Sequence, residues 1–159
     1  MRDLPDVINW RRISDEITTS GQPSETQLSE IQALGVTHIL NLGPHHNTGA
    51  LDDEASSVAA LGMEYVYIPV EFESPTDEDF AKFCAAVERL QHTQIHVHCI
   101  YNARVSAFFY RYSKTGRTIS QTEAHAMMDG IWRPGHDWAG FVGMPDARNQ
   151  PNRYAGDDY

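Results

Sequence analysis

Cys99 and Arg104 are the pair of residues in this sequence best suited to covalent chemistry on an anion. They stand between Ile95-His96-Val97-His98, which alternates like a strand entering a core, and a run of helical spacing that begins at Val105. Backbone N–H groups and the dipole at a helix start attract anions and favour the reactive thiolate form of a nearby cysteine. An arginine fork binds phosphate or sulfate bidentately. The spacing therefore predicts an anion site that contains a nucleophilic thiol.

The elements around this stretch predict an α/β fold. Strands are expected at residues 8–13, 16–19, 37–42, 63–69 and 94–98. Helix starts are marked by pairs with capping-box spacing: Ser24 with Gln27, Thr76 with Asp79, and Ser120 with Glu123. Strands separated by helices indicate crossover connections and a mostly parallel central sheet of about five strands, flanked by helices. Ligands bind beyond the carboxyl ends of such strands, where Cys99 and the loops after Leu42 and Pro69 should meet.

The stretch 97–106, Val-His-Cys-Ile-Tyr-Asn-Ala-Arg-Val-Ser, resembles the signature loop of the cysteine-dependent protein tyrosine phosphatase superfamily. It is most similar to bacterial dual-specificity-like phosphatases related to the beta-lactamase-hydrolase-like family. Ser20-Gly21-Gln22-Pro23, then 36–42 and 65–70, follow in the order of that family, so the resemblance spans roughly residues 10–133. It implies a tyrosine-phosphatase-like fold and a cysteine-based phosphatase, a phosphoric monoester hydrolase that forms a phosphocysteine intermediate, of the protein tyrosine or dual-specificity type.

The loop departs from the usual pattern of the superfamily in three ways. Four residues, not five, separate Cys99 from Arg104, and Ser106 follows Arg104 after one intervening residue. The usual loop glycine is absent, and Asn102 is expected to adopt the left-handed conformation in its place. These departures keep open the alternative of a catalytically weak or inactive phosphate-binding module of the same fold.

The resemblance also implies roles for individual residues. Cys99 is the nucleophile, and the Ser106 hydroxyl hydrogen-bonds its sulfur and eases breakdown of the phosphoenzyme. His98 orients the loop. The phosphate is bound by Arg104 and by the main chain of Ile100, Tyr101, Asn102 and Ala103. The general acid is expected after Val70, with Glu71 as the first choice and Glu73 as the second. The alternative is that both carboxylates face water and neither acts as the acid.

A zinc hydrolase is a third interpretation, since the sequence is rich in histidine: His45, His46, His96 and His98 could supply ligands. No carboxylate or cysteine falls at a spacing that completes such a site, so we expect neither a metal nor another cofactor. Cys84 lies in an apolar stripe of helical spacing and is expected to be a packed thiol. Redox pairing of Cys84 with Cys99 is the alternative.

The bulk properties limit the classes of partner. The chain has 159 residues and a net charge of −10, which argues against nucleic acid and anionic membranes. It has no apolar stretch of transmembrane or signal-peptide length, so we expect a cytoplasmic protein. The resemblance implies that its substrate is a phosphorylated protein or small molecule. Residues 1–144 should form the phosphatase-like domain and 145–159 a loose tail. The acidic runs 52–54 and 77–79 are expected to be solvated helix starts.

Overall fold

The computed structural model of the protein describes residues 2–154 and is built around a five-stranded sheet. Its strands are β1 (Arg11–Arg12), β2 (Ile17–Ser20), β3 (His38–Asn41), β4 (Glu64–Tyr67) and β5 (Ile95–His98). They lie in the order β1-β2-β5-β3-β4, and only the pairing of β1 with β2 is antiparallel. The expected mostly parallel sheet of about five strands is confirmed.

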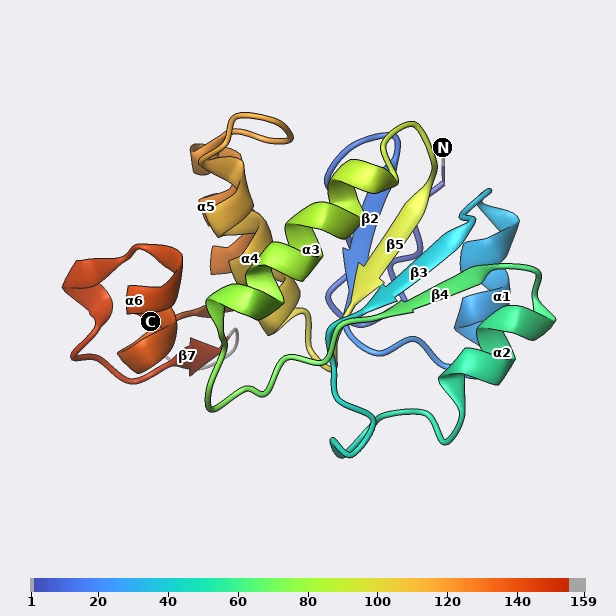
Figure 1. Cartoon of the computed structure of the whole chain (residues 1–159), viewed down its shortest axis with the longest axis horizontal. Helices are drawn as coiled ribbons and strands as arrows, with labels where there is room; N and C mark the ends of the chain where they lie inside the picture. The colour runs from blue at the N-terminus through green and yellow to red at the C-terminus, as the bar shows by residue number, and fades with distance from the viewer. Residues whose placement is uncertain (1, 155–159) are drawn as a thin grey trace.

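Helices cover both faces of this sheet (Figure 1). They are α1 (Glu25–Ala33), α2 (Glu54–Ala60), α3 (Asp77–Arg89), α4 (Ala103–Ser113), α5 (Gln121–Asp129) and α6 (His136–Val142). α1 and α2 pack on one face, while α3 and α4 pack on the other, each side with its own cluster of buried apolar side chains. The capping boxes predicted at Ser24, Thr76 and Ser120 are all formed. They satisfy backbone donors that the first helical turn leaves without partners.

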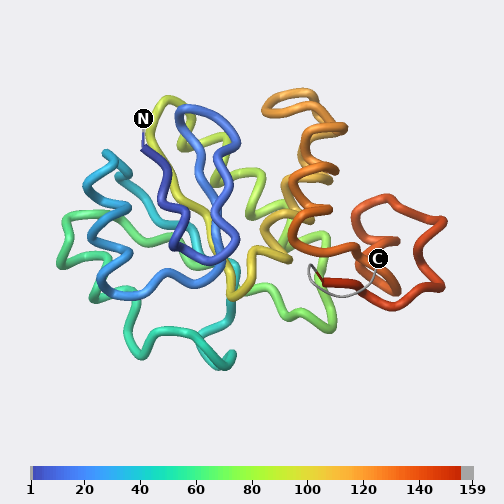
Figure 2. The backbone as a smooth tube through the Cα atoms, turned by 180° about the vertical axis from the view of Figure 1, so that it is seen from behind, coloured from blue at the N-terminus to red at the C-terminus, as the bar shows by residue number. Residues whose placement is uncertain are grey.

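The central strand β5 explains how Cys99 comes to the carboxyl edge of the sheet. Its alternation points Ile95 and Val97 into the cluster under α3 and α4. His96 points to the opposite face, where its ring stacks on Trp10 with centroids 5.1 Å apart. Figure 2 shows the N-terminal segment, which carries Trp10, crossing that face of the sheet. Cys99 is therefore the first residue after a strand that is buried on both faces.

The segment expected to be a loose tail instead folds back along its described part. It forms a 3-10 helix, η1 (Pro145–Ala147), and a strand, β7 (Arg153–Tyr154), which pairs with β6 (Trp132–Arg133). The Tyr154 ring stacks on Trp132 with centroids 5.9 Å apart, and this apolar contact holds the strand in place. Residues 155–159 of the predicted tail lie outside the described residues. Between residues 2 and 154, no helix is long and apolar enough to cross a membrane.

His96 is a buried histidine whose environment favours the neutral ring. Its nitrogens lie 2.9 Å from the Thr18 hydroxyl and 2.8 Å from the Ser20 hydroxyl. Burial lowers the pKa of His96 well below its usual value of 6.5, and the charge of His98 adds to this effect. The folded protein therefore keeps His96 neutral at pH values where the unfolded chain would protonate it.

This difference predicts a loss of stability in mild acid. Below pH 6.5 the unfolded state binds one more proton at His96 than the folded state. The free energy of unfolding should therefore fall by about 1.4 kcal/mol per pH unit as the pH drops below that value. Urea unfolding at a series of pH values measures the slope, and His96→Gln should remove this contribution. His92→Gln, at an exposed position, is the control, and equal slopes for wild type and His96→Gln would contradict the account.

Candidate active site

The turn between β5 and α4 is the feature that presents Cys99. Asn102 precedes the first residue of α4 and has φ of 69°, so it adopts the left-handed conformation that the sequence predicts. Its side-chain nitrogen, Nδ2, donates to the Asn9 carbonyl at 2.9 Å and to the Thr19 hydroxyl at 3.0 Å. These bonds hold a conformation that asparagine tolerates better than most residues. The turn is thereby fixed between the N-terminal segment and the sheet.

Three successive carbonyl groups of this loop are each bound from outside the turn. The Cys99 carbonyl lies 3.1 Å from His98 Nδ1, the Ile100 carbonyl accepts from the Gln22 N–H at 3.0 Å, and the Tyr101 carbonyl accepts from Asn9 Nδ2 at 2.8 Å. The approach of Gln22 needs glycine before it, because a Cβ on Gly21 would lie 2.5 Å from the Ile100 oxygen. The motif Ser20-Gly21-Gln22-Pro23 therefore braces the loop.

These outer bonds determine where the loop's N–H groups point. In a planar trans peptide the N–H of one residue is directed opposite to the carbonyl of the residue before it. The N–H groups of residues 100–102 therefore face away from the bracing groups. Within the described part of the chain these three N–H groups make no backbone hydrogen bond. Together with the start of α4 they form a cradle for an anion.

Arg104 stands in the first turn of α4 and is held by two loops that follow neighbouring strands. Its Nη1 donates to Asn47 Oδ1 at 3.0 Å and to the Val70 carbonyl at 2.9 Å. Both hydrogen bonds of this guanidinium in the described residues use Nη1, which leaves its remaining N–H groups for a ligand. The planar fork is thus oriented before any anion binds. Sequence reasoning did not identify Asn47, which directly follows His46.

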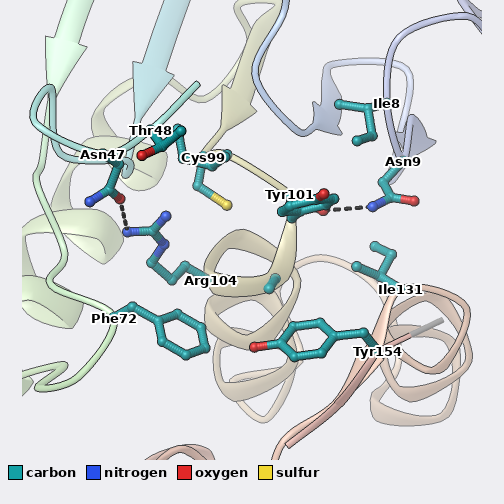
Figure 3. A pocket seen from close by; sticks show the side chains of 12 residues that line it. Ile8, Asn9, Asn47, Thr48, Phe72, Cys99, Tyr101, Arg104, Ile131 and Tyr154 are labelled. Carbon is teal, nitrogen blue, oxygen red and sulfur yellow. Dashed lines mark hydrogen bonds between the residues drawn. The ribbon is translucent and has the colours of Figure 1, made fainter. Parts of the chain in front are cut away.

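Cys99 and Arg104 meet in one pocket of ≈ 630 Å³ (Figure 3). The pocket is lined by Ile8, Asn9, Asn47, Thr48, Phe72, Cys99, Ile100, Tyr101, Ala103, Arg104, Ile131 and Tyr154. Cys99 is fully buried at the inner end of the pocket, and the rings of Phe72 and Tyr154 lie on the side of the Arg104 guanidinium. Arg104 is the one charged side chain among these lining residues. The site can therefore hold one anionic group against apolar and aromatic walls.

The two candidate acids lie outside the lining of this pocket. Glu71, whose side chain is 56% exposed, pairs with His46 at 2.8 Å. Glu73 is also exposed, but its charge affects Tyr154, which lines the pocket. Burial raises the pKa of Tyr154, and the negative charge of Glu73 raises it further. Of the two carboxylates, Glu73 is therefore the one whose electrostatic effect is felt at a lining residue.

Ser106 has other partners than the expected sulfur. Its hydroxyl donates to the Ala103 carbonyl at 3.0 Å and accepts from the Trp132 indole N–H at 3.2 Å. A hydroxyl has one proton to donate, so in this arrangement none is left for Cys99. The extra residue between Arg104 and Ser106 accounts for the difference, because one helical position rotates a side chain by about 100°.

The acidic run before α2 differs from the expectation. Asp53 caps α2 as a solvated helix start should, but Glu54 is only 1% exposed. One Glu54 oxygen lies 2.8 Å from His98 Nε2, and the other accepts from the Gln22 amide. Glu54 is thus the buried partner of the predicted loop-orienting histidine. An acidic run at a helix start carries no signal that separates its buried member from its exposed ones.

The four histidines considered as zinc ligands are divided among different partners. His98 bonds Glu54, His96 bonds two hydroxyls, His45 lies 2.8 Å from the Tyr65 hydroxyl, and His46 pairs with Glu71. Among residues 2–154, no group of three or more histidine, cysteine or acidic side chains is placed to hold a metal ion. The arrangement does not fit the zinc interpretation.

Cys84 and Cys99 stand on different elements, Cys84 in α3 and Cys99 in the turn after β5. Both cysteines are free, and burial raises the pKa of Cys84. Cys84 lies close enough to Tyr112 for its charge to raise the pKa of that phenol, after the larger effects of burial and Glu88. Cys84 is partly buried and packs against the core cluster on that side of the sheet, in agreement with the expected packed thiol.

Known proteins with similar structures share this architecture. A DUF442 protein from Shewanella putrefaciens CN-32 superposes with a TM-score of 0.77 and 31% identity, covering 87% of this chain and 91% of that chain. The core catalytic domain of the PP-IP phosphatase SIW14 from S. cerevisiae, in complex with citrate, has a TM-score of 0.63 and 17% identity, covering 77% of this chain and 76% of that chain.

TpbA of P. aeruginosa, in complex with pTyr, has a TM-score of 0.63 and 16% identity, covering 88% of this chain and 78% of that chain. At these identities the SIW14 and TpbA matches show a shared fold, and the expected tyrosine-phosphatase-like fold is confirmed. No protein-family model matches the chain, and no curated protein does.

Proposed function

This chain belongs to the DUF442 family, and from that premise we propose that it is a cysteine-dependent phosphate monoester hydrolase. The Shewanella protein is itself described provisionally as a phosphatase. The observation that carries the proposal is the convergence of the Cys99 sulfur, the N–H groups of residues 100–102 and the Arg104 fork on one pocket. Nucleophile and oxyanion donors are the two components that such a transfer needs in one place.

In the proposed reaction the Cys99 thiolate attacks phosphorus in line with the ester oxygen. The sulfur–phosphorus bond forms as the phosphorus–oxygen bond breaks, and the leaving oxygen takes a proton from an acid. The N–H groups of residues 100–102 and the Arg104 fork stabilise the charge on the remaining phosphoryl oxygens. Water then gives a proton to the deprotonated acid and attacks phosphorus; the sulfur–phosphorus bond breaks, and phosphate leaves while the thiolate and the acid are restored.

The acid is proposed to come from the loop that carries Phe72. Glu71 was the first choice from the sequence, but its pairing with His46 turns it to the exterior. The charge of Glu73 acts on Tyr154, a residue that lines the pocket. We therefore place Glu73 ahead of Glu71 as the residue that protonates the leaving oxygen.

Glu73→Gln should slow alkyl phosphates, whose leaving groups need a proton, by about 10²–10⁴-fold. Aryl phosphates with acidic leaving phenols should lose much less. Glu71→Gln, two positions away on the same loop, is the matched control and should change both rates little. Steady-state kinetics on the two substrate classes measures the difference. A large effect confined to Glu71→Gln would move the acid back to that residue, and unchanged rates in both variants would assign the proton to water.

A phosphate-binding module without turnover is the second candidate, and one observation favours it: among residues 2–154, no carboxylate lines the pocket. Both candidates predict binding of a phosphorylated protein or small molecule. Steady-state hydrolysis of an aryl phosphate separates them, because the hydrolase turns over and is inhibited by vanadate. A chelator should leave the rate unchanged, since no step of the proposed mechanism uses a metal. Vanadate or phosphate binding without turnover would favour the module.

A further inference from the structure

Glu54 and His98 form a buried ion pair that the proposed catalytic steps do not use. Their side chains are 1% and 0% exposed, and Nε2 of the imidazole lies 2.8 Å from a carboxylate oxygen. Charged side chains are almost never fully buried unless they are paired. Gln22 donates its amide N–H to the second carboxylate oxygen, so both oxygens of Glu54 have partners. His98 immediately precedes Cys99, so the pair adjoins the loop that carries the nucleophile.

The partners of the two groups indicate their charges. Burial alone would raise the pKa of Glu54, but the charge of His98 and hydrogen bonds from His98, Gln22 and Tyr65 outweigh burial and hold that pKa below its usual value. Glu54 is therefore a carboxylate and can only accept hydrogen bonds. The other ring nitrogen of His98, Nδ1, lies 3.1 Å from the Cys99 carbonyl, which also only accepts. An imidazole that donates from both nitrogens is the doubly protonated, positively charged ring.

We propose that Glu54 is a positioning residue that keeps His98 doubly protonated, so that His98 Nδ1–H fixes the Cys99 carbonyl and turns the Ile100 N–H toward the substrate phosphate. The proposal rests on the hydrolase function proposed above. Gln22 links this pair to the next peptide, because its backbone N–H binds the Ile100 carbonyl while its side chain binds Glu54. One carboxylate thus supports two successive peptides of the anion cradle.

The loss of this support should appear in the chemistry. Glu54→Gln should lower kcat for an aryl phosphate by about 10²-fold, the size of effect that a small misplacement of reacting groups produces. Vanadate affinity should fall with it, because the displaced Ile100 N–H is a ligand of the bound anion. Glu64→Gln is the matched control: Glu64 is also a carboxylate paired with a histidine, but its side chain is 75% exposed and lies outside the pocket. Glu54→Asp should recover part of the lost rate.

The state of the His98 ring is the readout that does not depend on turnover. ¹⁵N–¹H correlation spectra of the wild-type protein at neutral pH should show both His98 nitrogens protonated, and Glu54→Gln should change that pattern while Glu64→Gln leaves it unchanged. A neutral His98 ring in the wild type would overturn the proposal even if the protein is an active phosphatase. Absence of hydrolysis, with a doubly protonated His98 that still depends on Glu54, would instead refute only the hydrolase function.

A double variant separates positioning from general support of the core and remains informative if Glu54→Gln does not fold. Replacing a buried ion pair by apolar residues of similar volume commonly preserves stability. Glu54→Met/His98→Leu should therefore unfold cooperatively in urea at a similar concentration to the wild type, yet lose kcat and vanadate affinity as Glu54→Gln does. A folded double variant with kcat within a few-fold of the wild type would overturn the positioning role.

Discussion

Cys99→Ser should abolish hydrolysis of an aryl phosphate, with a loss of about 10⁴-fold or more, as is typical when a covalent nucleophile is removed. A serine alkoxide is far harder to form near neutral pH than a cysteine thiolate. The remaining parts of the cradle, the N–H groups of residues 100–102 and Arg104, are unchanged by this substitution. Phosphate binding by isothermal titration calorimetry should therefore persist while turnover is lost.

Cys84→Ser is the control for Cys99→Ser, because Cys84 lies within α3 and is not among the pocket-lining residues. Its activity should match that of the wild type. Iodoacetate should label Cys99 in preference to Cys84, and phosphate should protect Cys99. Turnover by Cys99→Ser within a few-fold of the wild type would end the covalent mechanism.

Arg104→Lys should cost about 10²–10³-fold in kcat, comparable to the loss of a preorganised oxyanion donor. Lysine keeps the charge but lacks the planar fork, and it cannot reproduce the bonds of Nη1 to Asn47 and the Val70 carbonyl while facing an anion. Vanadate inhibition should weaken in parallel with kcat. Steady-state kinetics with and without vanadate measures both effects.

Arg111→Lys is the matched control on the same helix, where Arg111 pairs with Asp77 and lies over the Phe80 ring. It should leave kcat and vanadate inhibition unchanged. Near-normal vanadate affinity in Arg104→Lys would mean that the Arg104 fork does not hold the anion.

The parts of the fold that depend on local physics were predictable from the sequence. Capping boxes at Ser24, Thr76 and Ser120 mark helix starts through interactions three residues apart, and the left-handed Asn102 follows from the absence of a loop glycine. The central strand was predictable from the alternation of Ile95-His96-Val97-His98. Each of these features is encoded within a few consecutive residues.

The features that the sequence did not reveal all depend on contacts between distant segments. Glu54 is buried because α2 begins opposite His98, and the hydrogen bond between these two residues spans 44 positions of the sequence. Asn47 reaches Arg104 across 57 positions. Tyr154 lines the pocket because β7 returns to β6, although its segment has the composition of a tail. The nucleophile, the fork and the loop-orienting His98 could be inferred from a motif, whereas the partners Glu54 and Asn47 could not.

The most direct test of the central claim is to trap the phosphoenzyme. Wild-type protein mixed with an excess of aryl phosphate should be quenched within one turnover and digested, and its peptides analysed by mass spectrometry. The account predicts one phosphoryl group on the sulfur of Cys99, formed with a burst of the aryl alcohol and absent from Cys99→Ser. Turnover by the wild type with the phosphoryl group on another residue, or with no burst and no phosphorylated peptide under the same quench, would contradict it.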